Sequence, residues 1–386
     1  MKVLHLIPYL APVYGGTAHV VPELASALGR SGLQVDVVTT TANGAAVLSV
    51  PVGQWCDRDS YRVQYFPTWH RHDLVVSRSL LTWLWQHLPD YDWLHTHTLF
   101  APMLAIAHRM AQQRGVPYVM TPHGMLDPWA IAHKAWKKQA YFRWIERPTL
   151  NHAAAIHVLN QREKAIVDTL SVSTPATIIP NGVALPPNVN DEEETQISPN
   201  ALTVVYLGRI DPKKGLDRLI QSVATVRSQH PHVHLVLAGP DALGYRATLQ
   251  RQIQSFNLDD AVTFTGLLTG DRKWSLLQSA DVFVYPSLSE GFSVAILEAM
   301  AMARPCIITT GCNFPEAADV AHIVEPEPEA IASALDQLLS DPSAAQTLGD
   351  RAQQFVQQQY TWAASAEALR QMYQHLKTPL ATHPSD

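Results

Sequence analysis

The fold is decided near the start of the chain, by Val3-Leu-His-Leu-Ile7, Gly15-Gly16 and Gln34-Val-Asp-Val-Val-Thr39. The first and last of these are short apolar runs, which are typical of buried strands. Between them, apolar side chains recur at helical spacing, and Gly32 is expected to stop that helix. The segment therefore predicts a β-strand, an α-helix and a second, parallel strand. The apolar positions of the predicted helix are Val20, Val21, Leu24 and Leu28.

The same alternation recurs along the rest of the chain. Short apolar runs separated by helical patterns lie at 93–95, 118–120, 155–158, 203–207, 234–238, 262–264, 281–285 and 305–309. This pattern predicts an α/β protein with two Rossmann-like, doubly wound domains. Folds of this kind bind ligands at the carboxyl ends of their strands, so we expect the two domains to face a central cleft that holds the site.

An acidic stretch without hydrophobic periodicity, residues 190–200, is expected to be an exposed connection between the domains. We predict an N-terminal domain over 1–188, which would bind the acceptor if the chain is a transferase, and a C-terminal domain over 189–362. Residues 363–386 are predicted to form a helix and a frayed tail. The option that this helix crosses back to the N-terminal domain stays open.

Composition excludes several classes of protein. The chain has 386 residues, of which 47% are hydrophobic and 16% charged, as in a globular protein of two domains. Residues 1–190 carry 15 basic and 11 acidic side chains, and residues 191–386 carry 13 and 23, so neither half is basic enough to predict nucleic-acid binding. Three cysteines without C-x-x-C spacing argue against a disulfide framework and a structural zinc. No apolar run reaches the roughly 18 residues that span a bilayer, and the start is too short for a signal peptide, so a cytoplasmic location is expected.

The richest chemical motif runs from Ala280 to Met300. A strand is expected to end at Tyr285, and Glu290 precedes Gly291 at the start of a helix that Ser293 could cap. Glu298 lies in a segment that is otherwise apolar nearly all round. A buried carboxylate needs a partner, and a ribose diol is one candidate. The alternatives are that both glutamates are solvated, or that Glu298 pairs with a nearby arginine.

A second motif, Gly208-Arg-Ile-Asp-Pro-Lys-Lys214-Gly-Leu216, follows a predicted strand and precedes a helix. Arg209 and Lys214 would then lie beside a helix N-terminus, which makes an anion site suited to a diphosphate. Ordinary surface cations are the alternative. Gly15-Gly16 is a weaker candidate of the same kind, because a glycine pair after a strand is often only a turn.

Histidines form the third feature. His123 follows the strand 118–120, so it is expected on a loop at the carboxyl edge of the first sheet. His95-Thr-His97 has the alternation of a metal-binding pair, but no third ligand of suitable spacing is visible. A packed or solvent-facing strand end is therefore favoured over a metal site.

In order along the chain, these motifs resemble glycosyltransferase family 4, the retaining nucleotide-sugar enzymes of the GT-B fold. The resemblance rests on Gly-Arg-x4-Lys-Gly at 208–215, Ala-Gly-Pro at 238–240, Val-x-Phe-x-Gly at 262–266 and Pro-Ser-x-x-Glu-Gly-Phe at 286–292. His123-Gly124 and Pro180-Asn-Gly-Val183 extend it over nearly the whole chain. The sequence around His123-Gly-Met-Leu-Asp-Pro-Trp129 is similar to members from bacterial exopolysaccharide, O-antigen or capsule assembly.

The resemblance implies a role for each matching residue. Arg209 and Lys214 would bind the donor diphosphate in place of a metal, and Glu298 would bind the ribose hydroxyls. The other implied donor contacts are Glu290 and His123 at the sugar, Gly208, Gly291, Phe292 and Ser293 at the sugar or phosphate, Leu267 near the base, and Gly15 and Gly16 near the phosphate or acceptor. The resemblance implies no cofactor and no metal.

The implied function is hexose transfer from a UDP- or GDP-sugar to a glycan or polyprenyl-linked acceptor in cell-surface polysaccharide synthesis. Two alternatives stay open: another GT-B enzyme, such as a phosphorylase or nucleotide-sugar epimerase, and a catalytically silent GT-B module that acts as a partner subunit.

Residues 134–147 mix five basic with four aromatic side chains in one predicted helix. Such a helix suits peripheral contact with the inner face of the plasma membrane. A domain helix with a solvated basic face is the alternative.

Overall fold

The computed structural model describes residues 1–71, 74–126, 135–184, 186, 201–241 and 243–377. Contacts divide the chain into two compact units. Unit 1 comprises Met1–Gly182 and Trp362–Asp386, and unit 2 comprises Val183–Thr361. This division by contacts falls after Gly182, six residues before the predicted boundary at 188. None of the helices in the described part of the chain is long and apolar enough to cross a membrane.

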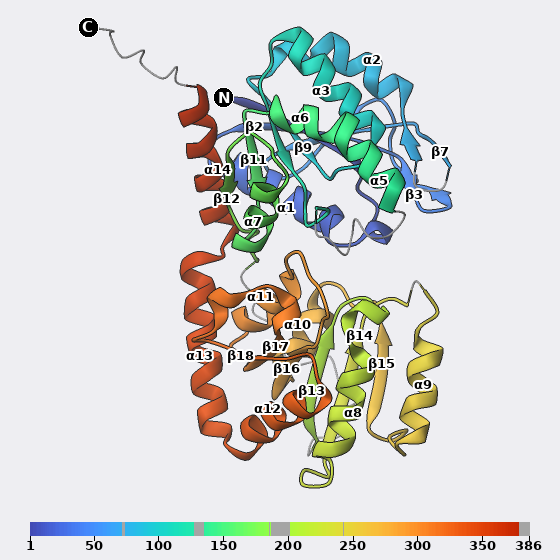
Figure 1. Ribbon diagram of the computed structural model, residues 1–386, viewed down its shortest axis with the longest axis vertical. Coiled ribbons are helices and arrows are strands. Elements are labelled where there is room, and N and C mark those ends of the chain that lie inside the picture. Colours follow the sequence, from blue (N-terminus) through green and yellow to red (C-terminus); the bar gives the residue numbers. More distant parts are fainter. Residues whose placement is uncertain (72–73, 127–134, 185, 187–200, 242, 378–386) are drawn as a thin grey trace, which may run out of the picture. The chain divides into compact units, whose positions relative to one another are not determined.

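Unit 1 is built on an eight-stranded sheet. Neighbouring strands are parallel except at one edge, where β5 and β6 are antiparallel. A short turn closed by the Arg58 N–H and the Tyr61 carbonyl joins these two strands, and so short a connection permits only antiparallel pairing. The order across the sheet is β12 (Ala176–Ile178), β11 (Ala155–Val158), β10 (Tyr118–Thr121), β9 (Trp93–His97), β1 (Lys2–Tyr9), β2 (Gln34–Thr40), β6 (Arg62–Phe66) and β5 (Trp55–Asp57) (Figure 1).

The helices of unit 1 cover this sheet. In α1 (Gly16–Arg30) the predicted apolar positions are all buried. The C-terminal helix α14 (Trp362–Lys377) packs against α1, and the Ser365 hydroxyl donates to the carbonyl of Pro180 (Figure 1). The other helices are α2 (Arg78–His87), α3 (Pro102–Arg114), α5 (Ala135–Tyr141), the π-helical turn η3 (Phe142–Glu146), α6 (Arg147–Asn151) and α7 (Gln161–Thr169).

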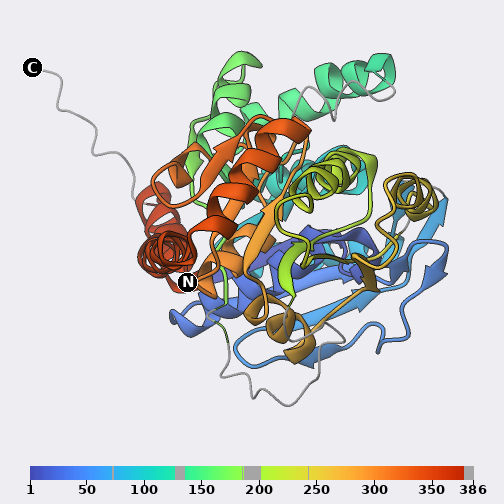
Figure 2. The same ribbon diagram turned by 90° about the horizontal axis from the view of Figure 1, so that it is seen from below.

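Unit 2 is a six-stranded, wholly parallel sheet in the order β15 (Val262–Gly266), β14 (Val233–Ala238), β13 (Leu202–Leu207), β16 (Val282–Tyr285), β17 (Cys306–Thr309) and β18 (His322–Val324). All five strands predicted in this half are present. The strand order reverses at β13, as in a doubly wound fold. Helix α8 (Leu216–Val226) packs on α12 (Pro328–Ser340), and α11 (Val294–Ala301) packs on α13 (Pro342–Gln359) (Figures 1 and 2). The remaining helices are α9 (Arg246–Ser255) and α10 (Asp271–Gln278).

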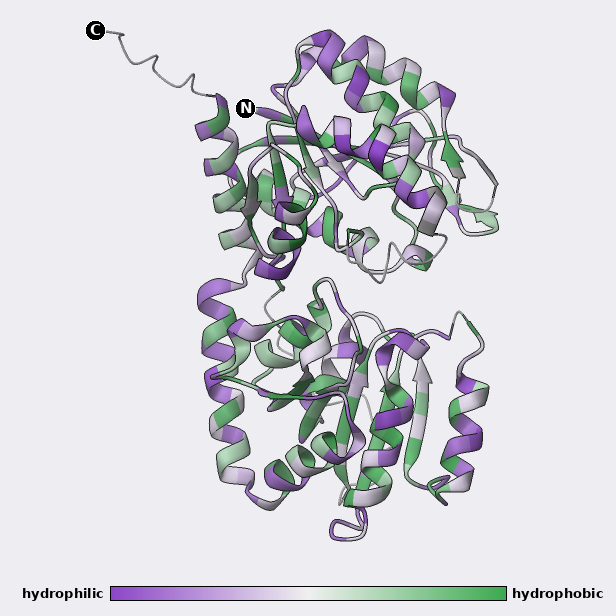
Figure 3. Cartoon of the chain, in the orientation of Figure 1, coloured by the Kyte–Doolittle hydropathy of each residue, from purple (hydrophilic) through white to green (hydrophobic). Residues whose placement is uncertain are grey.

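Each unit has its own hydrophobic core. The strands of unit 2 are mostly hydrophobic, whereas most helices carry hydrophilic as well as hydrophobic residues (Figure 3). This is the pattern expected of parallel strands that are covered on both faces. The rigid sheets therefore leave the loops at their carboxyl ends to carry polar chemistry.

Candidate functional site

Three loops of unit 2 meet at the carboxyl edge of the sheet, after β13, β16 and β17. The Leu288 N–H donates to the Lys213 carbonyl at 2.9 Å, which joins the first two loops. The Glu290 N–H donates to the Gly311 carbonyl at 2.8 Å, and the Asn313 side-chain amide donates to the Glu290 carbonyl at 2.6 Å. The loop that carries Glu290 is therefore fixed on both sides by backbone hydrogen bonds.

Glycine makes this close approach possible. Gly215 has φ +65°, and a Cβ atom there would lie 2.2 Å from the Pro286 carbonyl oxygen. A Cβ at Gly311 would lie 2.3 Å from the Ser287 carbonyl oxygen. Both contacts are with backbone, which cannot swing aside, so the two positions require glycine.

Lys214 and Glu290 form an ion pair at the centre of these loops. The Lys214 ammonium lies 2.5 Å from Glu290 Oε1 and 3.0 Å from the Tyr285 hydroxyl, and the Ser287 hydroxyl donates to the same carboxylate oxygen at 2.7 Å. Both charged side chains are about one-tenth exposed. Burial raises the pKa of Tyr285, so its phenol stays neutral beside the pair. Lys214 and Glu290, which belong to two separate sequence motifs, are thus in direct contact.

Arg209 differs from Lys214 in being exposed and in making no ion pair with any described residue. Its backbone is held by the Tyr206 hydroxyl, which donates to the Arg209 carbonyl at 2.8 Å. Gly208, directly before it, is bonded through its N–H to the Ala238 carbonyl. The loop thus presents a cation that is available to an anionic ligand.

Glu298 is buried on α11 and pairs with Lys273 of α10 at 2.6 Å. This lysine replaces the arginine partner considered in the sequence analysis, and no sequence signal distinguished it from other cations on helix surfaces. The pair uses Oε1 of Glu298, and no residue in the described ranges donates to Oε2. One carboxylate oxygen is therefore free to accept from a ligand hydroxyl.

The predicted cap at Ser293 is wrong. Ser293 occupies the N-cap position of α11, but its side chain accepts no hydrogen bond from the first turn of the helix. The first N–H groups of α11 consequently lack a side-chain acceptor from their own cap, and such groups attract anions. Gly291 and Phe292, just before Ser293, are partly buried, while Leu267 after β15 is 61% exposed.

The predicted residues of unit 1 lie at the carboxyl ends of β1 and β10. His123 has a left-handed backbone, with φ +53°, and is half-buried. The neighbouring Gly124 N–H donates to Glu163 of α7 at 2.6 Å, and the Leu159 N–H donates to the other oxygen of that carboxylate at 2.8 Å. Burial raises the pKa of Glu163, a positioning residue that the sequence analysis missed. Gly15, with φ +80°, and Gly16 form the N-terminus of α1.

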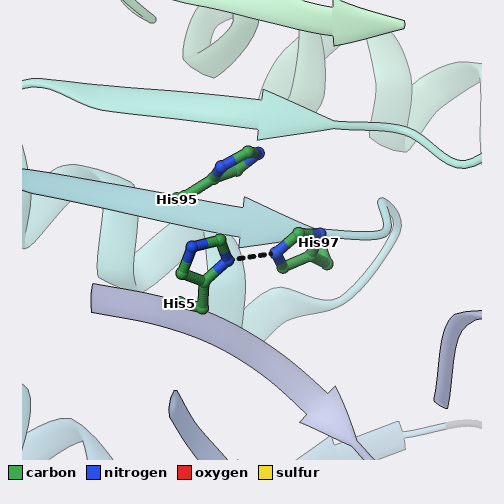
Figure 4. Close-up of side chains that lie close together, drawn as sticks. All are labelled: His5, His95 and His97. Carbon is green, nitrogen blue, oxygen red and sulfur yellow. Dashed lines mark hydrogen bonds between the residues drawn. The ribbon is translucent and has the colours of Figure 1, made fainter. Parts of the chain in front are cut away.

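A cluster of buried histidines lies in the same unit. His5 of β1 is adjacent to His95 and His97 of β9, and one nitrogen of each of the three rings lies within 4.8 Å of the others (Figure 4). The expectation that His95 and His97 lack a third partner is therefore wrong, because β1 and β9 are neighbours in the sheet although far apart in sequence. A solvent-facing strand end is also excluded, since all three side chains are buried.

The cluster fits a hydrogen-bond network better than a metal site. Both ring nitrogens of His95 are bonded, to Tyr373 and Thr121, and both of His97 are bonded, to His5 and His123. Only Nε2 of His5 lacks a partner among the described residues. Three free lone pairs are thus not available together to a cation.

The comparisons with known proteins agree with these two units. The family description "Glycosyl transferase 4-like domain" matches residues 15–182, and "Glycosyl transferases group 1" matches residues 189–355. D-inositol 3-phosphate glycosyltransferase of Corynebacterium urealyticum is 24% identical over 96% of this chain and 94% of the relative.

Solved structures have the same fold. The sucrose-phosphate synthase of Thermosynechococcus elongatus gives a TM-score of 0.77 at 22% identity, over 97% of this chain and 99% of the other. Anabaena Alr3699/HepE in complex with UDP and glucose gives 0.74 at 19% identity, over 97% and 100%. The fold is therefore GT-B, and the family descriptions that match both units define the class as glycosyltransferase. Within that class, the chain belongs to the family 4 type, as its motifs predict.

Proposed function

We propose that this glycosyltransferase is a retaining enzyme that moves a hexose from a UDP- or GDP-sugar to a glycan or lipid-linked acceptor of a cell-surface polysaccharide. The carrying observation is the loop cluster of unit 2. Arg209 and Lys214 lie on the loop after β13, and Lys214 bonds to Glu290, four residues before a helix whose cap residue accepts no bond from it. A diphosphate brings two to three negative charges, which two cations and a helix N-terminus suit.

The chemistry follows from where charge develops. As the bond between sugar and phosphate breaks, negative charge grows on the diphosphate, and groups aimed at that charge stabilise the transition state more than the ground state. Arg209 supplies an exposed guanidinium that makes no ion pair with the described residues. Lys214, held by Glu290, supplies an ammonium that is already in place, so no reorganisation is needed when the charge appears. These two cations would serve in place of a metal ion.

The remaining donor contacts follow from the same loops. Oε2 of Glu298 can accept from the ribose hydroxyls, and the exposed Leu267 can pack on the base. The UDP bound to the similar Anabaena protein supports a uridine donor, although a guanosine donor fits the same groups. We propose retention by front-face attack, in which the leaving phosphate takes the proton of the acceptor, with His123 hydrogen-bonding the donor sugar.

The helix that begins at Ala135 supports a membrane-associated acceptor; Lys134, the first residue of the predicted segment, lies outside the described residues. Trp136 and Trp144 are 72% and 74% exposed, and Arg143 between them is exposed too. Exposed tryptophans beside cations suit the headgroup region of an anionic membrane, and this supports the proposal that the enzyme works at the cytoplasmic face of the plasma membrane. Replacing both tryptophans by alanine should abolish co-sedimentation with phosphatidylglycerol vesicles, and replacing Trp69, 61% exposed elsewhere in unit 1, should not. Equal binding by both variants would exclude this helix as the anchor.

The pathway is tested in a strain that lacks the gene. We expect the strain to lose a surface polysaccharide, and wild-type protein to restore it while Glu290→Ala does not. Restoration by Glu290→Ala would instead identify a catalytically silent partner subunit. The linkage formed by purified enzyme, read by NMR, tests retention, since an inverted anomeric centre contradicts front-face attack.

A further inference from the structure

One face of the sheet in unit 1 carries an unbroken chain of three imidazoles. His5 Nδ1 lies 2.8 Å from His97 Nε2, and His97 Nδ1 lies 3.0 Å from His123 Nε2. The ring planes of His5 and His97 are inclined by 15° and their centroids lie 5.1 Å apart, which is compatible with an N–H···N bond between the two facing nitrogens (Figure 4). The chain therefore runs from the buried sheet to the His123 loop.

All three rings are neutral near pH 7. Burial lowers the pKa of His5 and of His123 to about 3, and burial together with the neighbouring imidazoles holds the pKa of His97 well below its usual range. A neutral imidazole carries one N–H and one lone pair. His97 consequently donates to one neighbouring imidazole and accepts from the other. The two hydrogen bonds among the three imidazoles therefore run in the same direction.

The surroundings of His5, the buried end of this row of three imidazoles, show which direction the hydrogen bonds take. Nε2 of His5 is buried and has no partner among the described residues. If His97 donated to Nδ1 of His5, the proton of His5 would lie on Nε2 and would have no acceptor. Buried N–H groups without an acceptor are rarer than buried acceptors without a donor. The favoured arrangement has His5 Nδ1–H donating to His97, and His97 Nδ1–H donating to Nε2 of His123.

We propose that His5 and His97 are positioning residues that hold His123 as its Nδ1–H tautomer, so that His123 acts as a neutral hydrogen-bond donor to the sugar or phosphate of the donor substrate. The role toward substrate rests on the function proposed above. No described residue accepts from Nδ1 of His123, so this N–H is available to a ligand oxygen. In the opposite tautomer the same nitrogen would present a lone pair to the oxygens of the substrate.

A second chain on the same face provides an internal reference. The Ile179 carbonyl can only accept, so His157 must carry its proton on Nε2, 2.7 Å away. The lone pair on His157 Nδ1 then accepts from the Thr121 hydroxyl, which in turn accepts from Nε2–H of His95. The two chains thus require opposite tautomers: Nδ1–H in His5, His97 and His123, and Nε2–H in His95 and His157.

Long-range proton–nitrogen NMR distinguishes these tautomers. The sample is the full-length protein, labelled with ¹⁵N-histidine and free of ligand. We expect both sets of assignments at pH 7. The change His97→Phe should release His123 into a mixture of tautomers, whereas His108→Phe, which removes a buried histidine of α3 outside both chains, should leave His123 as Nδ1–H. An Nε2–H signal from His123 in the wild type, or an unchanged His123 in His97→Phe, would overturn the proposal. Should that variant fail to fold, the wild-type spectrum decides alone.

Hydrolysis of UDP-glucose supplies the functional readout. We expect His97→Phe to lose roughly tenfold in kcat/KM, the value of one hydrogen bond of about 1.4 kcal/mol, while His108→Phe stays within about twofold. Equal losses in the two variants would show that His97 is merely structural. If UDP-glucose is turned over by no form of the protein, that donor is wrong, whereas the tautomer assignment still stands or falls on the NMR spectrum.

Discussion

The ammonium of Lys214 lies 2.5 Å from Oε1 of Glu290, although 76 residues separate the two in sequence. Two loops that follow non-consecutive strands, β13 and β16, bring them together. Because the pair is nearly buried, each charge depends on the other for its stability as well as for its position.

Replacing Lys214 by methionine should therefore reduce both stability and turnover. The change leaves the Glu290 carboxylate buried without its cation, which should lower the free energy of unfolding by about 3 kcal/mol in urea denaturation. Loss of a group that stabilises developing charge should reduce turnover of the sugar nucleotide by about 10²-fold or more. Lys213→Met, at the adjacent position, is the control. Equal effects of the two changes would show that Lys214 has no special role.

Gly215 should tolerate no side chain. Alanine at this position would adopt a left-handed conformation and collide with the Pro286 carbonyl, so we expect a loss of roughly 3 kcal/mol or more in unfolding free energy. Gly244 has a similar φ, +70°, but open space around its Cβ position, so Gly244→Ala should cost only about 1 kcal/mol. Similar losses of unfolding free energy in the two variants would mean that the loops that carry Gly215 and Pro286 can move apart freely.

Much of the fold was predictable because the spacing of apolar residues is a local property of the sequence. The buried strands of unit 2 are continuous apolar runs, and all five predicted ones are present. Strand β6 was missed because Arg62-Val-Gln-Tyr-Phe66 is not a short apolar run, the pattern on which the other strands were predicted. The antiparallel edge strand β5 was missed with it, since its pairing depends on that neighbour.

Sequence identified the residue types of the site but not the contacts between them. His5 was predicted to lie in a strand, yet its contact with His97 depends on which strands are neighbours, and spacing along the chain does not contain that information. Lys273 resembles any solvated cation on a helix until the fold brings it to Glu298. Ser293 has the residue type of a cap, but its side chain makes no bond to the N–H groups of α11.

Replacing Glu298 should weaken nucleotide binding more than replacing Lys273. Glu298→Gln removes the charged acceptor for ribose, and a charge-assisted hydrogen bond of about 1.5–3 kcal/mol corresponds to a loss of roughly tenfold or more in UDP affinity. Lys273→Met leaves that carboxylate in place, so UDP affinity should change by no more than about threefold, although the protein is destabilised. Calorimetric titration with UDP measures both. A larger loss in Lys273→Met would assign ligand binding to the lysine instead.

Glu146 should make unit 1 sensitive to pH. Its carboxyl accepts from the Phe100 N–H at 2.6 Å, and burial raises its pKa from 4.5 to about 7. The folded state therefore binds this proton more tightly than the unfolded chain, so stability falls as pH rises from about 4.5 to 7 and is constant above. At 1.36 kcal/mol per pKa unit, the contribution is at most about 3 kcal/mol.

Glu146→Gln keeps the acceptor and removes the titration. We expect its unfolding free energy to vary less than that of the wild type between pH 4.5 and 7, and to exceed the wild-type value above pH 7. Glu327→Gln, an exposed position in unit 2, should leave the wild-type profile unchanged. An identical profile for Glu146→Gln would show that this carboxyl titrates normally.

Release of nucleoside diphosphate from UDP-, GDP-, ADP- and CMP-sugars, where CMP-sugars release the monophosphate, tests the donor site of unit 2 most directly. We predict turnover of one class, UDP or GDP, that is unchanged by EDTA and about 10²-fold lower in Arg209→Ala. Arg251→Ala, an exposed arginine of α9, should keep wild-type turnover. No release from any sugar nucleotide, or release that Arg209→Ala leaves intact, would contradict the assignment of these loops as the donor site.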